Sequence, residues 1–194
     1  MIKTYLKRMV PLAGLLAIGC LPVSLEPLYT AKDLVVDNTL VGTWDGEDEK
    51  ERWMFESAEE QAYVLRHTDS EGKNAVFKAH LLKLKGERFL DLYPDDLEVE
   101  LNWLAACQLV PGHVFFKVQL SEKELRIAPM DLDWLGDYLE EHPKAIGHKR
   151  FDDGDRILLT ASTADLQKFV LKHVKNPKAF DPESVLVLRR RSSQ

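Results

Sequence analysis

Short runs of alternating apolar and polar residues dominate the chain after residue 34. The runs in the first half cover residues 40–44, 51–56, 62–67, 75–84 and 88–93. Polar links that contain glycine separate several of them, at 45–48, 69–72 and 85–87. Apolar residues at every second position predict strands with one buried face, and short polar links between them predict hairpins. This half of the chain therefore predicts an antiparallel meander.

The second half mixes strand and helix periods. Residues 113–120 and 124–128 predict another hairpin, 146–151 and 156–160 predict a strand pair, and 185–189 predict a last strand. A helix is expected from Asp131 or Asp133 to about residue 141, and another from the capping residue Ser162 to about residue 175. A third short helix fits residues 101–110. We expect one mainly β (β-rich α+β) domain over 34–194, an antiparallel meander barrel or strongly curved sheet with two or three short helices.

Gly42-Thr43-Trp44 on the first predicted strand resembles the opening motif of lipocalins and related barrels. The resemblance implies a lipocalin-like barrel in which Trp44 packs across the closed end and Gly42 permits close backbone approach. Seven aromatic residues on the predicted strands are expected to fill a small barrel, with the lining of a ligand cavity as the alternative. They are Trp53, Phe55, Tyr63, Phe77, Phe89, Phe115 and Phe116.

The first 19 residues have the pattern of a secretory signal peptide. Lys3, Lys7 and Arg8 precede an apolar run over 9–18 that is about half the roughly 20 residues needed to cross a bilayer as a helix. We therefore expect residues 1–19 to be removed.

The sequence Ala17-Ile18-Gly19-Cys20 resembles the lipobox of bacterial lipoproteins. This resemblance implies cleavage between Gly19 and Cys20, acylation of Cys20, and a tether over residues 20–33. Leu21 is not the aspartate that this family associates with retention in the inner membrane. The expected location is the bacterial cell envelope, in the outer membrane facing the periplasm. An ordinary signal peptide with an incidental Cys20 is the alternative.

Charge narrows the range of partners. The chain carries 26 Lys and Arg residues against 32 Asp and Glu residues, which argues against nucleic acid as a partner. If Cys20 is acylated, Cys107 has no disulfide partner, and its apolar surroundings in the sequence predict a buried side chain. The six histidines are scattered without metal-ligand spacing, so we expect no metal site and no cofactor.

Two main hypotheses of function remain. The first is a non-enzymatic, membrane-anchored lipoprotein that binds an apolar or amphipathic small molecule, or an envelope protein, through one end of the barrel. Its candidate lid or contact residues are Trp103, Leu104 and Trp134, with packing in the core as the alternative for them. The alternative is an exported hydrolase or isomerase with a site assembled from Asp91, His80 and His113 across neighbouring strands. A structural role as an assembly scaffold in the envelope is the third possibility.

Overall fold

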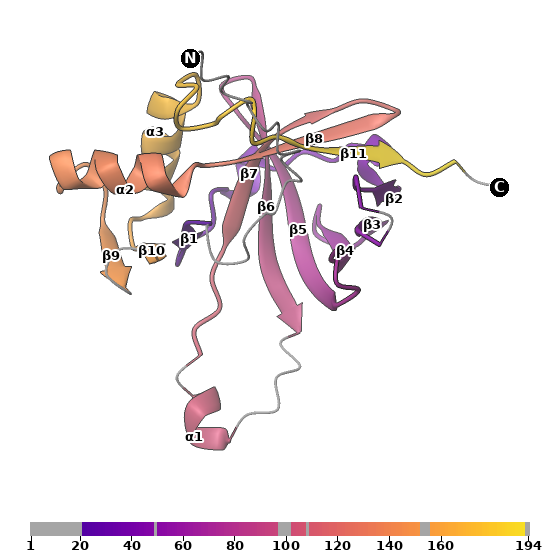
Figure 1. Ribbon diagram of the computed structural model, residues 1–194, viewed down its shortest axis with the longest axis horizontal. Helices are drawn as coiled ribbons and strands as arrows, with labels where there is room; N and C mark the ends of the chain where they lie inside the picture. The colour runs from indigo at the N-terminus through magenta and orange to yellow at the C-terminus, as the bar shows by residue number, and fades with distance from the viewer. Residues whose placement is uncertain (1–20, 49, 97–101, 108, 152–155, 193–194) are drawn as a thin grey trace, which may run out of the picture.

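The computed structural model describes residues 21–48, 50–96, 102–107, 109–151 and 156–192 (Figure 1). Gly19, Cys20 and the predicted signal peptide lie outside these ranges, as do residues 152–155 between the strands of the last predicted pair. Within the described ranges, none of the helices is long and apolar enough to span a membrane.

Eight antiparallel strands close into a barrel, which confirms the predicted fold class. Each strand from β2 to β8 pairs with the next along the chain, and β11 closes the ring between β8 and β2. The strands are β2 (Gly42–Asp45), β3 (Arg52–Ser57), β4 (Tyr63–Thr68), β5 (Asn74–Leu84), β6 (Glu87–Asp96), β7 (Val114–Leu120), β8 (Glu124–Pro129) and β11 (Leu186–Arg190).

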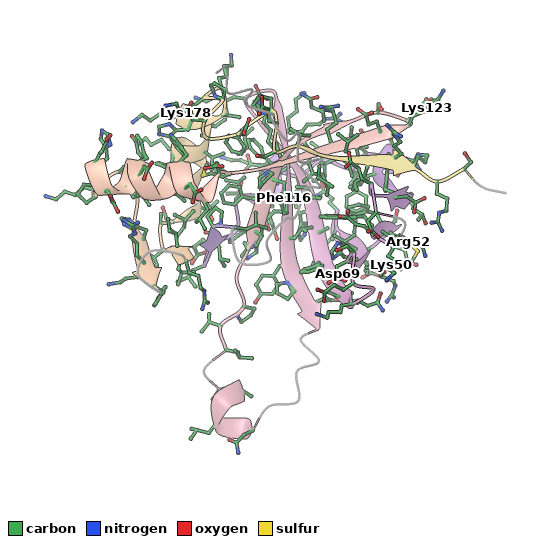
Figure 2. The ribbon with its side chains drawn as sticks, viewed as in Figure 1. Lys50, Arg52, Asp69, Phe116, Lys123 and Lys178 are labelled. Atoms are coloured by element: carbon green, nitrogen blue, oxygen red, sulfur yellow. The ribbon has the colours of Figure 1, made fainter. Side chains whose placement is uncertain are left out.

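Apolar side chains from every strand occupy the barrel interior. The largest are Trp44, Trp53, Phe55, Tyr63 and Phe116, and each is at most 7% exposed. Phe116 lies in the body of the barrel, whereas Lys123 lies at the tip of the β7–β8 hairpin (Figure 2). An eight-stranded barrel is just wide enough to be filled by side chains alone, and this one is packed in that way.

A second layer covers part of the outside of the barrel. It contains a small sheet of β1 (Val23–Ser24), β10 (Arg156–Leu159) and β9 (His148–Phe151), together with α2 (Leu132–Glu141) and α3 (Thr163–His173). Asp131 and Ser162 cap the two helices by accepting hydrogen bonds from the amides of Trp134 and Asp165.

This second layer creates a separate apolar core on the outer face of the barrel. Phe89 and Phe115 point into it, while their neighbours Leu90 and Phe116 point into the barrel. Strands β6 and β7 are therefore buried on both faces. Seven aromatic residues were predicted to fill the barrel. The same alternation places two of them, Phe89 and Phe115, outside it.

Trp44 is fully buried in the barrel interior and contacts the last strand. The indole nitrogen of Trp44 donates to the Leu40 carbonyl at 2.9 Å, and the Arg190 guanidinium lies 4.2 Å from the centre of a Trp44 ring. Arg190 also donates to the carbonyls of Val41 and Glu122. Gly42 has a φ of +124°, and a Cβ there would lie 2.7 Å from Arg190 Nη1. The glycine thus permits the approach of the arginine to the tryptophan.

Residues 21–33 form a strap that packs on the barrel, where a tether was expected. Ser24 forms a two-way backbone bridge with His113, with N–O distances of 2.8 and 2.7 Å, and β1 pairs with β10. Leu28 is fully buried in the outer core. The tether prediction relied on prolines and absent periodicity, but a strap can pack through a few apolar residues without a regular period.

Candidate functional site

An excursion between β6 and β7 stands away from the barrel (Figure 1). Its described part comprises residues 102–107 and 109–112 and includes the short helix α1 (Trp103–Ala106). Leu104, Leu109 and Val110 are 56%, 48% and 73% exposed. In the sequence, no residue from 102 to 112 is charged, although 30% of the chain is Asp, Glu, Lys or Arg. Glu98 and Glu100 precede this stretch in the sequence. Exposed apolar side chains on an uncharged stretch are typical of a contact surface.

Cys107 lies on this excursion and its side chain is exposed. The prediction of a buried side chain was wrong, because the apolar stretch around it leaves the sheet instead of packing against it.

The three predicted contact residues do not come together. Trp103 and Leu104 lie in α1, and the side chain of Trp103 is outside the described part of the structure. Trp134 lies on α2, where its ring is 5.2 Å from Tyr138, 6.4 Å from Phe169 and 4.9 Å from His173 between centres. Trp134 therefore belongs to the packing between α2 and α3, and Leu104 belongs to the excursion.

The strap begins at the end of the barrel from which the excursion leaves. Leu21, the residue after Cys20, packs against the barrel interior, as do Phe77 and Val114. Val114 starts β7, directly after the excursion, and the Ser24–His113 bridge is one residue earlier. The first described residues and the base of the excursion are thus neighbours.

A buried cluster of Asp91, His113 and His80 lies beneath the strap. Asp91 is fully buried, and its Oδ1 is 2.6 Å from Nδ1 of His113. Because a carboxylate only accepts hydrogen bonds, Nδ1 of His113 carries the proton. Asp91 Oδ2 accepts a hydrogen bond from the backbone amide of Leu28 at 2.9 Å. The carboxylate therefore joins β6, β7 and the strap.

His80 pairs with Asp91 across the β5–β6 ladder and completes the cluster. Its ring lies 4.3 Å from that of Tyr29, and its Nδ1 has no hydrogen-bond partner among the described residues. Burial lowers the pKa of His80, so its imidazole is neutral near pH 7. Burial and the nearby Asp91 carboxylate raise the pKa of Tyr29 to about 12.

The sequence hypothesis correctly grouped Asp91, His80 and His113, but their surroundings favour a structural role. They lie on the outer face of the barrel wall, covered by Leu28 and Tyr29 of the strap. Asp91 uses both carboxylate oxygens in bonds within the protein. The hydroxyl of Ser24, the serine opposite His113, donates to the Glu26 carbonyl at 2.8 Å. The cluster therefore holds the strap in place through the two hydrogen bonds of Asp91 and the contacts of Tyr29 with both histidine rings.

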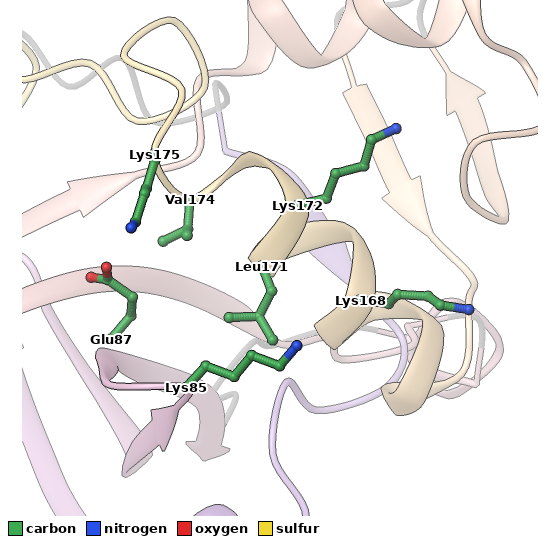
Figure 3. A pocket seen from close by; sticks show the side chains of 7 residues that line it. All are labelled: Lys85, Glu87, Lys168, Leu171, Lys172, Val174 and Lys175. Carbon is green, nitrogen blue, oxygen red and sulfur yellow. The ribbon is translucent and has the colours of Figure 1, made fainter.

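A shallow basic groove of about 420 Å³ lies between the β5–β6 turn and α3 (Figure 3). Four lysines, Glu87, Leu171 and Val174 line it. Two charged groups that line the groove already have partners. Glu87 pairs with Lys117 at 3.4 Å, and Lys172 donates to the Tyr138 hydroxyl at 3.1 Å. The groove can attract anions, but its lysines are surface groups that fix no ligand geometry.

No group of three or more His, Cys, Asp or Glu side chains in the described ranges is placed to hold a metal ion. Comparison of the chain with protein-family models, with curated proteins and with solved structures found no match in any of the three. The functional interpretation therefore depends on the sequence and the geometry alone.

Sequence reasoning missed several residues that shape these sites. Leu109 and Val110 were recognisable from the uncharged run around Leu104. Leu28 and Tyr29 carried no periodic signal, and the position of Arg190 over Trp44 depends on ring closure by β11.

Proposed function

We propose that the protein is a bacterial envelope lipoprotein, acylated at Cys20, whose barrel is a solid body that docks onto an apolar partner surface. Docking occurs through the β6–β7 excursion at the end of the barrel next to the anchor, and it involves no catalysis. The observation that carries this proposal is the uncharged stretch 102–112 of the excursion, with exposed Leu104, Leu109 and Val110, placed beside the strap that follows Cys20.

The packing of the barrel supports docking over storage of a small ligand. Trp44, Phe55 and Tyr63 are at most 1% exposed, and they share the interior with apolar side chains from all eight strands. An apolar molecule would have to displace this core in order to enter. Binding at the outer surface of one end requires no such rearrangement.

The enzymatic alternative has its own motivating observation, the cluster of Asp91, His80 and His113. A catalytic group needs access to a substrate, and the strap covers all three residues. Both carboxylate oxygens of Asp91 already accept hydrogen bonds within the protein, from Leu28 N and His113 Nδ1. Docking is therefore the function that the geometry supports best.

Metabolic labelling with a fatty acid tests the proposed anchor. The chain has two cysteines, which provide a matched pair of variants, Cys20→Ala and Cys107→Ala. We expect label in the wild type and in Cys107→Ala and none in Cys20→Ala. Wild-type protein without label, or label that persists in Cys20→Ala, would refute acylation at Cys20.

A further inference from the structure

We infer that the apolar surface contacted by the β6–β7 excursion is the bilayer that holds the acylated Cys20. This inference rests on the proposed function and specifies its partner. The excursion would act as a second, shallow contact with the membrane, so that the barrel is held at two points and not by the lipid anchor alone.

The first argument is position. Ser24 and His113 are joined by two backbone hydrogen bonds, and Leu21 packs at the same end of the barrel as Val114. Cys20 is four residues before Ser24, and Val110 is three residues before His113. A chain spans at most about 3.6 Å per residue, so the anchor and the excursion are confined to the same side of the barrel.

The second argument is chemistry. Burying a charge in a bilayer is costly, and the sequence from 102 to 112 has none. Leu104, Leu109 and Val110 already expose apolar surface that a bilayer interface would bury. The sequence also places a tryptophan at 103, a residue type that is enriched at membrane–water interfaces.

A bilayer fits this surface better than a protein partner does. Protein interfaces surround an apolar centre with a polar rim that fixes the register of the two partners. The stretch 102–112 offers no charged side chain for such a rim, and the two glutamates of the excursion, Glu98 and Glu100, precede it in the sequence. The anchor also keeps the bilayer beside the excursion at all times, which makes even a weak apolar contact effective.

The charge of the protein adds a specific expectation. The chain has a formal net charge of −6, and Asp95 lies exposed near the end of β6. Anionic lipids would repel such a protein. The excursion should therefore insert into vesicles of pure phosphatidylcholine, and anionic lipid should not improve insertion.

Fluorescence quenching tests the contact, because Cys107 places a thiol on the excursion. Full-length acylated protein, extracted from membranes, is labelled at Cys107 with an environment-sensitive dye and reconstituted into phosphatidylcholine vesicles that contain lipids with a quencher on the acyl chain. The control carries the dye at the β5–β6 turn, as Lys85→Cys in a Cys107→Ser background. We expect quenching of the dye at 107 and none at 85.

A double variant, Leu109→Asp with Val110→Asp, isolates the apolar contact. We expect it to remain on the vesicles through its anchor and to lose most of the quenching at Cys107. Circular dichroism checks that its barrel remains folded.

The outcomes separate the two proposals. Vesicle-bound wild-type protein with no quenching at 107 would overturn the bilayer contact and leave the lipoprotein proposal standing. An unquenched excursion that crosslinks in native membranes to one stoichiometric protein would overturn it in favour of a protein partner. Protein that does not float with the vesicles at all would contradict the anchor, and the bilayer contact would fall with it.

Discussion

Replacing Asp91 with alanine is expected to release the strap and to destabilise the whole protein. The carboxylate is fully buried and accepts two hydrogen bonds, one from Leu28 N at 2.9 Å and one from His113 Nδ1 at 2.6 Å. Alanine removes both acceptors and leaves two buried donors without partners. Such donors are costly, because in the unfolded chain they would be bonded to water.

The magnitude follows from these two bonds. A hydrogen bond to a charged group contributes about 1.5–3 kcal/mol, and Asp91 accepts two of them. We therefore expect Asp91→Ala to lower the free energy of unfolding by about 3–6 kcal/mol. Asp91→Asn retains one acceptor oxygen, so its cost should be about half as large.

Urea unfolding measures the global effect, and hydrogen exchange at the Leu28 amide measures the local one. If about 3 kcal/mol of local stability is lost, exchange at Leu28 should accelerate by about a hundredfold. The control is Asp137→Ala on the exposed side of α2, which should change the free energy of unfolding by less than about 0.5 kcal/mol. If Asp91→Ala matched this control, the assignment of Asp91 as the residue that holds the strap would be refuted.

Four further predictions follow from the structure. Trp44→Ala should lower the free energy of unfolding by about 3–5 kcal/mol in urea titrations, because it removes a fully buried side chain from the barrel interior. Gly42→Ala should cost more than about 1 kcal/mol in the same assay, because a Cβ at φ +124° meets Arg190; an unchanged midpoint would contradict the close approach. Burial lowers the pKa of His80 in the folded protein. As the pH falls through about 6.5, the unfolded state therefore binds more protons than the folded state, and the free energy of unfolding decreases. The fall in unfolding free energy between pH 7.5 and pH 5 should be smaller in His80→Phe, whereas the exposed His142→Phe should retain the wild-type slope. Cys107 should react with a maleimide in the native protein at a rate close to that in urea, and strong protection would contradict its exposure.

The strands were predictable where their turns fix the register. Lys85 and Gly86 both have positive φ values, as a two-residue hairpin turn requires. This turn sets the pairs of the β5–β6 ladder from Leu84–Glu87 to Phe77–Pro94, including His80 opposite Asp91, and a bulge shifts the register beyond Phe77. The meeting of those two residues was therefore already contained in the local sequence.

The position of His113 in the cluster is not determined by the local sequence. It arrives on β7 after an excursion whose length does not determine where the next strand begins to pair. The strap was also unpredictable, because Leu28 packs through a single side chain and one amide instead of through a periodic pattern. Sequence patterns predict regular elements well, and they predict poorly the irregular segments that depend on surfaces assembled from distant strands.

The lysine groove shows the same limit. Lys85 follows β5, and Lys168 and Lys175 lie more than 80 residues later in the chain. Lys168, Lys172 and Lys175 are close together in the sequence, but nothing in the local sequence shows that Lys85 joins them. The groove exists only because α3 packs beside the β5–β6 turn (Figure 3).

The most direct test of the account is the mass of the mature N-terminus from native membranes. We expect the first residue to be Cys20 and its mass to exceed that of the unmodified peptide by the attached acyl groups. A mature protein that begins elsewhere, or that begins at an unmodified Cys20, would contradict the anchor on which the docking proposal depends.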